Sequence, residues 1–146
     1  MAHGLGEMMT NGRFAMRPSA QLRAALGQYR LIEDDVVAIG VRRDEARKQA
    51  LVRSRRQLAE EVCRLGPAIE ADEELALDPD RQQEIRRLFA AMRYSLALHQ
   101  ADWPAVTIDE DPLAYRRSAA AVQEKSDAFW AWCHANLGLK RDQFGA

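Results

Sequence analysis

The sequence predicts an all-α fold, an antiparallel bundle of three long helices with one additional N-terminal helix. Apolar side chains recur at steps of three and four residues in four separate segments, the spacing that places them on one face of an α-helix. The chain contains 8 glycines and 5 prolines, and no long run alternates β-branched or aromatic residues with polar ones. The composition therefore favours helices over strands.

At 146 residues, the chain has the usual length of one domain and can bury a core without a disulfide or a metal ion. Residues 1–18 are rich in glycine, lack a sustained periodicity and end at Pro18, so we expect a disordered N-terminal segment. The helical domain is expected to span residues 19–138 and a short tail to span residues 139–146.

The first predicted helix spans residues 19–39 and begins at Ser19, a residue type whose hydroxyl caps helix N-termini. Four β-branched residues lie among positions 36–41, which lowers the helix propensity and predicts a kink or a break near Gly40. One continuous helix over residues 19–65 is the alternative. The apolar stripe of the first helix consists of Leu22, Leu26, Tyr29, Ile32, Val36 and Ile39.

The second predicted helix spans residues 44–65, and Gly66 and Pro67 are expected to end it. Its apolar residues are small or widely separated, so we expect the helix to be exposed over most of its circumference. Residues 70–80 are predominantly acidic, which is typical of a solvated linker. A basic patch at the start of the second helix consists of Arg42, Arg43, Arg47, Lys48, Arg53, Arg55 and Arg56.

The third and fourth predicted helices span residues 80–102 and 112–137. An Asp-Pro pair precedes or opens each helix, which supplies a capping carboxylate and a proline suited to the first helical turn. Gly138 is expected to close the last helix, because glycine readily adopts the left-handed conformation found there.

Aromatic residues gather toward the end of the last helix. The apolar stripe can bury Phe129 together with either Trp130 or Trp132, so the other tryptophan is expected to be at least half exposed. Trp103, at the end of the third helix, is expected to close the bundle against Phe129 and Trp130.

The favoured functional hypothesis is a non-enzymatic protein-interaction module, meaning an adaptor, an export-chaperone-like protein or a regulatory helical protein. The stripe of the first helix is richer than a domain of this size requires, which favours self-association or the binding of a protein partner there. Trp130 and Trp132 are further candidate contacts, because tryptophan is enriched at binding hot spots. No catalytic residue, cofactor or metal site is predicted.

Nucleic-acid binding through the basic patch is the first alternative. The net charge of the whole chain is −1, two acidic residues interrupt the patch, and no aromatic residue is interleaved for base stacking. These features disfavour a nucleic-acid partner. The excess of arginine over lysine is better explained by a GC-rich genome, and we expect a bacterial source.

A metal or acid/base site at His99 and Asp102 is the second alternative, because the two residues lie three positions apart on one helix. The sequence lacks the Glu-x-x-His motif of di-iron bundles. We therefore favour a histidine at the end of the core stripe that is hydrogen-bonded to Asp102 or to a backbone carbonyl.

The two cysteines, Cys63 and Cys133, are interpreted as small buried hydrophobic residues in a reducing compartment, the cytoplasm. His134 follows Cys133 directly, but neighbours on a helix point about 100° apart, so the two are not expected to form a catalytic pair. No apolar run reaches the length of about 18 residues that a membrane span requires, so no membrane association is expected.

Overall fold

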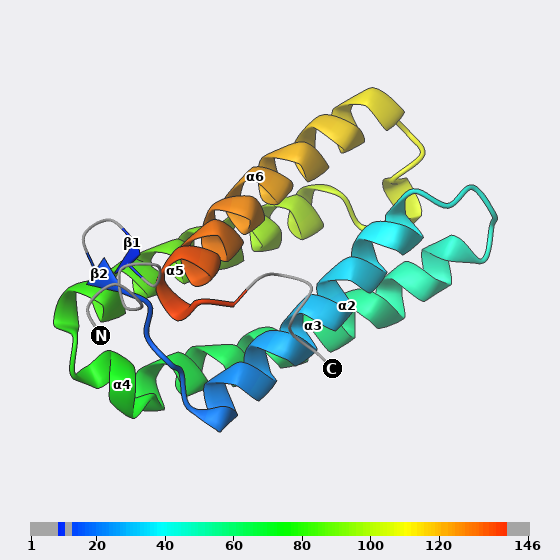
Figure 1. Cartoon of the computed structure of the whole chain (residues 1–146). Coiled ribbons are helices and arrows are strands. Elements are labelled where there is room, and N and C mark those ends of the chain that lie inside the picture. Colours follow the sequence, from blue (N-terminus) through cyan, green and yellow to red (C-terminus); the bar gives the residue numbers. More distant parts are fainter. Residues whose placement is uncertain (1–8, 11–12, 140–146) are drawn as a thin grey trace.

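A computed structural model describes residues 9–10 and 13–139 of the chain (Figure 1). The prediction of an all-helical protein is confirmed. The only strands in the described ranges are β1 (Met9–Thr10) and β2 (Arg13–Phe14), which form a two-residue antiparallel pair. The helices are α2 (Ala20–Gly40), α3 (Arg47–Ala71), α4 (Glu73–Ala76), α5 (Pro79–Asp102), the 3-10 turn η1 (Ala105–Thr107) and α6 (Pro112–Leu137).

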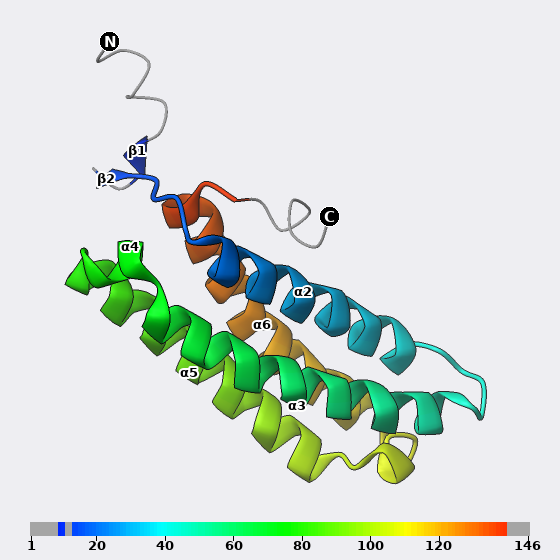
Figure 2. The same ribbon diagram turned by 90° about the horizontal axis from the view of Figure 1, so that it is seen from below.

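The long helices pair as two hairpins. Helix α2 packs along α3, and α5 packs along α6 (Figures 1 and 2). The short helix α4 joins the two hairpins at one end, where it contacts both α3 and α5. This arrangement is consistent with the predicted bundle. It also answers the open question about residues 19–65: they form two helices, with the break directly after Gly40.

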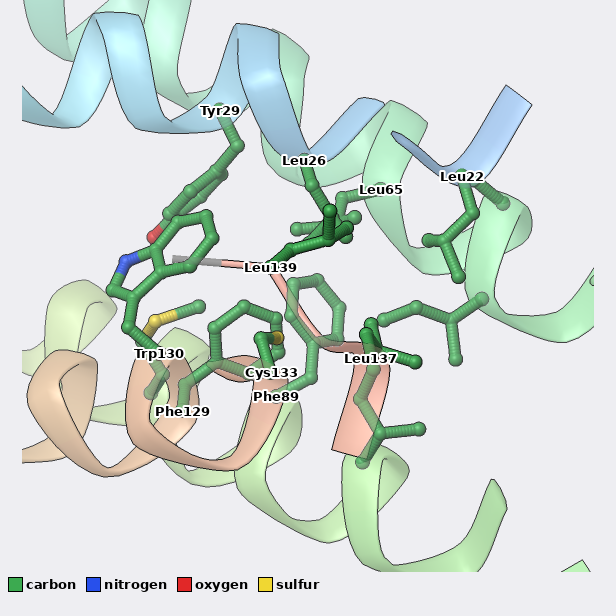
Figure 3. Close-up of a cluster of buried hydrophobic side chains, with 14 of the residues drawn as sticks. Leu22, Leu26, Tyr29, Leu65, Phe89, Phe129, Trp130, Cys133, Leu137 and Leu139 are labelled. Atoms are coloured by element: carbon green, nitrogen blue, oxygen red, sulfur yellow. The ribbon is translucent and has the colours of Figure 1, made fainter. Parts of the chain in front are cut away.

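The main core lies between the two hairpins (Figure 3). Its centre is aromatic: the ring of Trp130 meets the ring of Phe129 edge-on at 5.3 Å, and lies 6.3 Å from the ring of Tyr29 on α2. Phe89 of α5 approaches Phe129 at 6.1 Å. A second, smaller cluster lies at the end of the bundle away from α4 and consists of Ile39, Leu51, Ala105 and Ile108.

Four of the predicted helix ends are found in the structure, at Ser19, Asp78, Asp111 and Gly138. The side chain of Ser19 accepts a hydrogen bond from the backbone N–H of Leu22 at 3.1 Å, which satisfies one of the unpaired donors of the first turn. Asp78 and Asp111 cap α5 and α6 in the same way. Gly138 ends α6 with a φ angle of +66°, a conformation that side-chain-bearing residues rarely adopt.

The prediction that Gly66 and Pro67 end the second helix is wrong, because α3 continues through both residues to Ala71. Proline inside a helix removes one backbone hydrogen bond and costs about 3 kcal/mol. Burial of Ala68 and Ile69 immediately after it offsets that cost, because both side chains pack into the main core.

The acidic segment 70–80 is consequently not a loop but the end of α3, all of α4 and the start of α5. Asp72 organises this turn. Its carboxylate, 2 % exposed, accepts hydrogen bonds from the backbone N–H of Leu75 at 2.9 Å and from that of Ser19 at 2.8 Å. One side chain therefore caps α4 and also fixes the entry to α2.

Helix α3 is less exposed than its composition predicts. Leu51, Leu58 and Leu65 lie seven residues apart and are all buried, with Ser54 and Glu61 buried between them. Seven-residue spacing keeps these leucines on one face, where they join Ala68 and Ile69 in holding the helix against its neighbours.

The terminal segments are described only in part. Of the predicted N-terminal segment, residues 1–8 and 11–12 lie outside the described residues, as do residues 140–146 of the predicted tail. The described part of the N-terminal segment runs beside the end of α6, where the backbone N–H of Met16 donates to the carbonyl oxygen of Asn136 at 2.6 Å.

Replacing Asp72 should reveal its double role. Asp72→Ala removes a helix cap and leaves the backbone N–H of Ser19 without its acceptor, so we expect a loss of about 2–3 kcal/mol in the free energy of unfolding. The matched control is Asp111→Ala, which removes only an exposed cap and should cost about 0.5–1 kcal/mol. Urea denaturation followed by circular dichroism measures both, and equal losses in the two variants would contradict the double role.

Candidate functional site

The stripe of the first helix, predicted to bind a partner, is used inside the chain itself. Leu22 and Leu26 are fully buried and Tyr29 is 1 % exposed, all in the main core. Ile39 is buried in the smaller cluster, and Ile32 and Val36 are half-buried against the core. The stripe is therefore covered within the chain itself, and its role in binding a partner stays a prediction. The stripe looked too rich because α3 and α6, which cover it, could not be placed from the sequence.

The two tryptophans of α6 also make intramolecular contacts. Trp130 is 5 % exposed, and its indole Nε1 donates a hydrogen bond to Glu33 of α2 at 3.0 Å. Trp132 is half-buried, and its Nε1 donates to Glu84 of α5 at 2.8 Å. Neither indole is an exposed anchor for a partner in this structure.

Glu33 is a structural residue that the sequence analysis missed. Its buried carboxylate accepts hydrogen bonds from Trp130 and from the hydroxyl of Ser126, and so joins α2 to α6. The available signal was its position, four residues after Tyr29, which places it on the apolar stripe. A charged residue on such a stripe is retained only where hydrogen bonds satisfy it.

Trp103 does not meet Phe129 and Trp130, which corrects that prediction. Because α5 and α6 are antiparallel, the end of α5 faces the start of α6, whereas Phe129 and Trp130 lie near the other end. The half-buried indole of Trp103 instead meets Tyr115 edge-on at 5.7 Å, beside the smaller core cluster.

The basic patch is divided among separate intramolecular contacts. Arg47 is buried and forms an ion pair with Asp109, which Lys48 approaches at 3.5 Å. Arg55 donates to the carbonyl oxygen of Trp103 at 2.7 Å. The remaining residues of the patch are exposed: Arg42, Arg43, Arg53 and Arg56. Of these, Arg42 forms an ion pair with Asp44 at 2.6 Å.

His99 is 8 % exposed, and its Nδ1 shares a hydrogen bond of 2.6 Å with the hydroxyl of Ser118 on α6. The predicted partner, Asp102, is exposed and does not make this bond. Burial, reinforced by the nearby Arg55 guanidinium and only partly opposed by Asp102, lowers the pKa of His99 from 6.5 to about 4. The imidazole is therefore neutral at pH 7 and helps to hold α5 against α6.

The two cysteines differ in their environments. Cys133 is buried as predicted, and burial raises the pKa of its thiol well above the ordinary value, so the thiolate is disfavoured. His134 is exposed on another face of α6. Cys63 is exposed, which corrects its predicted burial: it lies between the buried positions Glu61 and Leu65, but on the outer side of α3.

Metal-binding clusters and membrane-spanning helices are both absent from the part of the chain that the structure describes. Nowhere in that part do three His, Cys, Asp or Glu side chains come together in a way that could hold a metal ion. None of the helices within residues 13–139 is both long and apolar enough to cross a membrane.

A groove between α3 and α5 is the surface feature that sequence reasoning missed. It has a volume of about 710 Å³ and an apolar floor that includes Phe89 and Ile69. The sequence signal was the run of small or short residues on each side, above all Gly66 and Ala90, which project little over the floor. The lining residues are Gly66, Pro67, Ile69, Glu70, Ala71, Arg86, Phe89, Ala90 and Arg93.

Two arginines of α5 border this groove. Arg86 donates from Nε and from its terminal nitrogen to the two carboxylate oxygens of Glu70, at 2.7 and 2.5 Å, so that this pair joins the two walls. The hydrogen bond from Arg86 lowers the pKa of Glu70. The guanidinium carbon of Arg93 lies 5.6 Å from the centre of the Phe89 ring, within the range of a cation–π contact.

Comparisons with protein-family models, with curated proteins and with solved structures found no match. The contacts of the chain itself are therefore the guide to its function.

The buried, neutral state of His99 predicts a specific pH dependence of stability. Its pKa is lower in the folded chain than in the unfolded chain, so its contribution is complete above pH 6.5 and is lost as the pH falls toward 4. His99→Gln keeps a side chain that can bond Ser118 but cannot be protonated. Between pH 7.5 and pH 4.5 we expect wild type to lose about 1–2 kcal/mol more unfolding free energy than this variant.

Chemical denaturation at a series of pH values measures the difference. The matched control is His134→Gln, which removes an exposed histidine from α6 and should follow the wild-type curve. Parallel curves for wild type and His99→Gln would show that His99 is not held in its neutral form by the fold.

Proposed function

We propose that this chain is a non-enzymatic protein-interaction module that binds a partner protein through the groove between α3 and α5. The observation that carries the proposal is the groove itself: its lining between the two helices is largely apolar and is bordered by charged side chains. An apolar floor with a polar rim is the usual anatomy of a protein-binding surface. The adaptor, export-chaperone-like and regulatory roles all remain within this proposal.

The other candidate binding surfaces make contacts within the chain, which supports the choice of the groove. The stripe of α2 is packed into the core, and Trp130 and Trp132 bond to carboxylates of the same chain. We consequently transfer the partner-binding role from the first helix to the groove. Self-association through α2 would require the main core to open, which makes a homodimer of that kind the less favoured form of the proposal.

The proposal includes no catalytic activity. Two groups that could serve as a nucleophile or a base are buried, which supports this choice: the Cys133 thiol is fully buried, and the His99 imidazole is 8 % exposed. Nucleic-acid binding is disfavoured, since Arg47 and Arg55 make contacts within the chain that divide the basic patch. We place the protein in the reducing cytoplasm, where an exposed thiol such as that of Cys63 persists.

One substitution in the groove tests the proposed binding surface. Ala90→Glu introduces a longer, charged side chain above the apolar floor, at an exposed helical position where glutamate is well tolerated. The matched control is Ala97→Glu, at another exposed position of α5 that does not line the groove. We expect a partner protein from the native host to be captured by wild type and by the control, and at least tenfold less by Ala90→Glu.

Quantitative mass spectrometry of the proteins retained on the three immobilised chains provides the measurement. Identical retention by all three chains, or no specific retention by wild type, would contradict the proposed function. Circular dichroism and melting curves establish that each variant remains folded.

A further inference from the structure

We infer that the groove between α3 and α5 recognises a partner segment that carries one large apolar side chain next to a carboxylate. This inference rests on the proposed function and specifies the chemistry of the partner. Three features of the groove carry it: the apolar floor, the charges along the rim and the distance between the floor and Arg93.

The floor calls for an apolar anchor. Phe89 and Ile69 form its base and are 6 % and 1 % exposed, so the accessible apolar surface comes from the exposed side chains of Ala71 and Ala90 above them. Pro67 adds a further apolar surface on the α3 side and has no backbone N–H to donate. A leucine, isoleucine, methionine or aromatic side chain would exchange water for these contacts.

The charges on the rim call for a carboxylate. Among the described residues that line the groove there are two cations, Arg86 and Arg93, and one anion, Glu70. Glu70 is held at the Arg86 end by two hydrogen bonds, so the rim carries an excess positive charge at the Arg93 end. A partner carboxylate would complement that excess.

Arg93 is arranged to receive such a carboxylate. Its guanidinium lies near the ring of Phe89, a placement that restricts the long side chain while the N–H groups at the edge of the guanidinium remain able to donate. Arginine and carboxylate form paired, charge-assisted hydrogen bonds, which give directional recognition as well as attraction.

The spacing limits the length of the segment. Arg86 and Arg93 are seven residues apart on α5, and Ala90, beside the floor, lies between them, three residues from Arg93. Three residues correspond to roughly 4.5 Å along the helix axis, which is less than two residues of extended chain or one turn of helix. An anchor over the floor and a carboxylate at Arg93 should therefore lie within four residues of each other in the partner.

Peptide selection tests the inference even though the partner is unidentified. Phage-displayed random 12-residue peptides are selected on the wild-type full chain, with the Ala90→Glu chain as competitor. We expect the enriched peptides to share a Leu, Ile, Met, Phe or Trp within four residues of an Asp or Glu. Failure to enrich any peptide, or enrichment without the acidic residue, would overturn the inference.

Charge reversal on both sides sharpens the test. Binding of one synthetic enriched peptide, measured by fluorescence anisotropy, should weaken at least tenfold with Arg93→Glu and less than twofold with Arg87→Glu, an exposed arginine of α5 outside the groove. A peptide with lysine in place of its acidic residue should prefer Arg93→Glu over wild type. Equal effects of the two arginine variants would overturn the role assigned to Arg93.

The outcomes separate this inference from the proposed function. Peptides that lose binding to Ala90→Glu but show no acidic preference would contradict the carboxylate inference and leave the groove as a binding surface. Capture of the host partner that is insensitive to Ala90→Glu would contradict the proposed function, whatever the peptides show.

Discussion

The structure depends on one buried carboxylate, that of Glu33, and on the two α6 side chains that donate hydrogen bonds to it. Ser126 and Trp130 bond to this side chain from the opposite hairpin, within an otherwise apolar layer. A buried carboxylate without partners would be strongly destabilising, so the two hairpins must meet in the register that supplies both donors. That register also places the indole of Trp130 beside Tyr29, as Figure 3 shows.

This register decides which surfaces remain for other molecules. Once α3 and α6 together cover the inner face of α2, the apolar stripe of α2 is inside the protein. Helices α3 and α5 lie on the other side of the core and contact each other less closely than the helices within each hairpin, so an apolar groove stays open between them. The proposed binding site is thus a consequence of the way in which the hairpins meet.

The sequence predicted helix boundaries correctly where the residue that sets the boundary acts on its immediate neighbours. Ser19 and Gly138 act on residues next to them, so their roles as helix boundaries could be predicted correctly. Asp72 and Pro67 could not be interpreted in this way, because Asp72 also bonds Ser19, which is 53 residues away, and the burial of the turn after Pro67 requires the other hairpin.

The candidate site was less predictable than the fold for the same reason. The groove exists only because two helices lie at a particular separation, and neither helix alone shows it. The division of the basic patch also depends on distant residues: Asp109, which pairs with Arg47, is 62 positions further along the chain. Patterns within a single helix identified its inner face correctly but could not tell whether another part of the chain covers that face.

Helix α2 is packed into the core, so its apolar stripe is not a free surface. Amide hydrogen exchange followed by mass spectrometry tests this packing most directly. If Glu33 and the aromatic layer hold α2 against α6, peptides from residues 22–33 should exchange as slowly as peptides from residues 126–137, since both would open only with the core. Fast exchange throughout α2, with slow exchange retained in α6, would contradict the account.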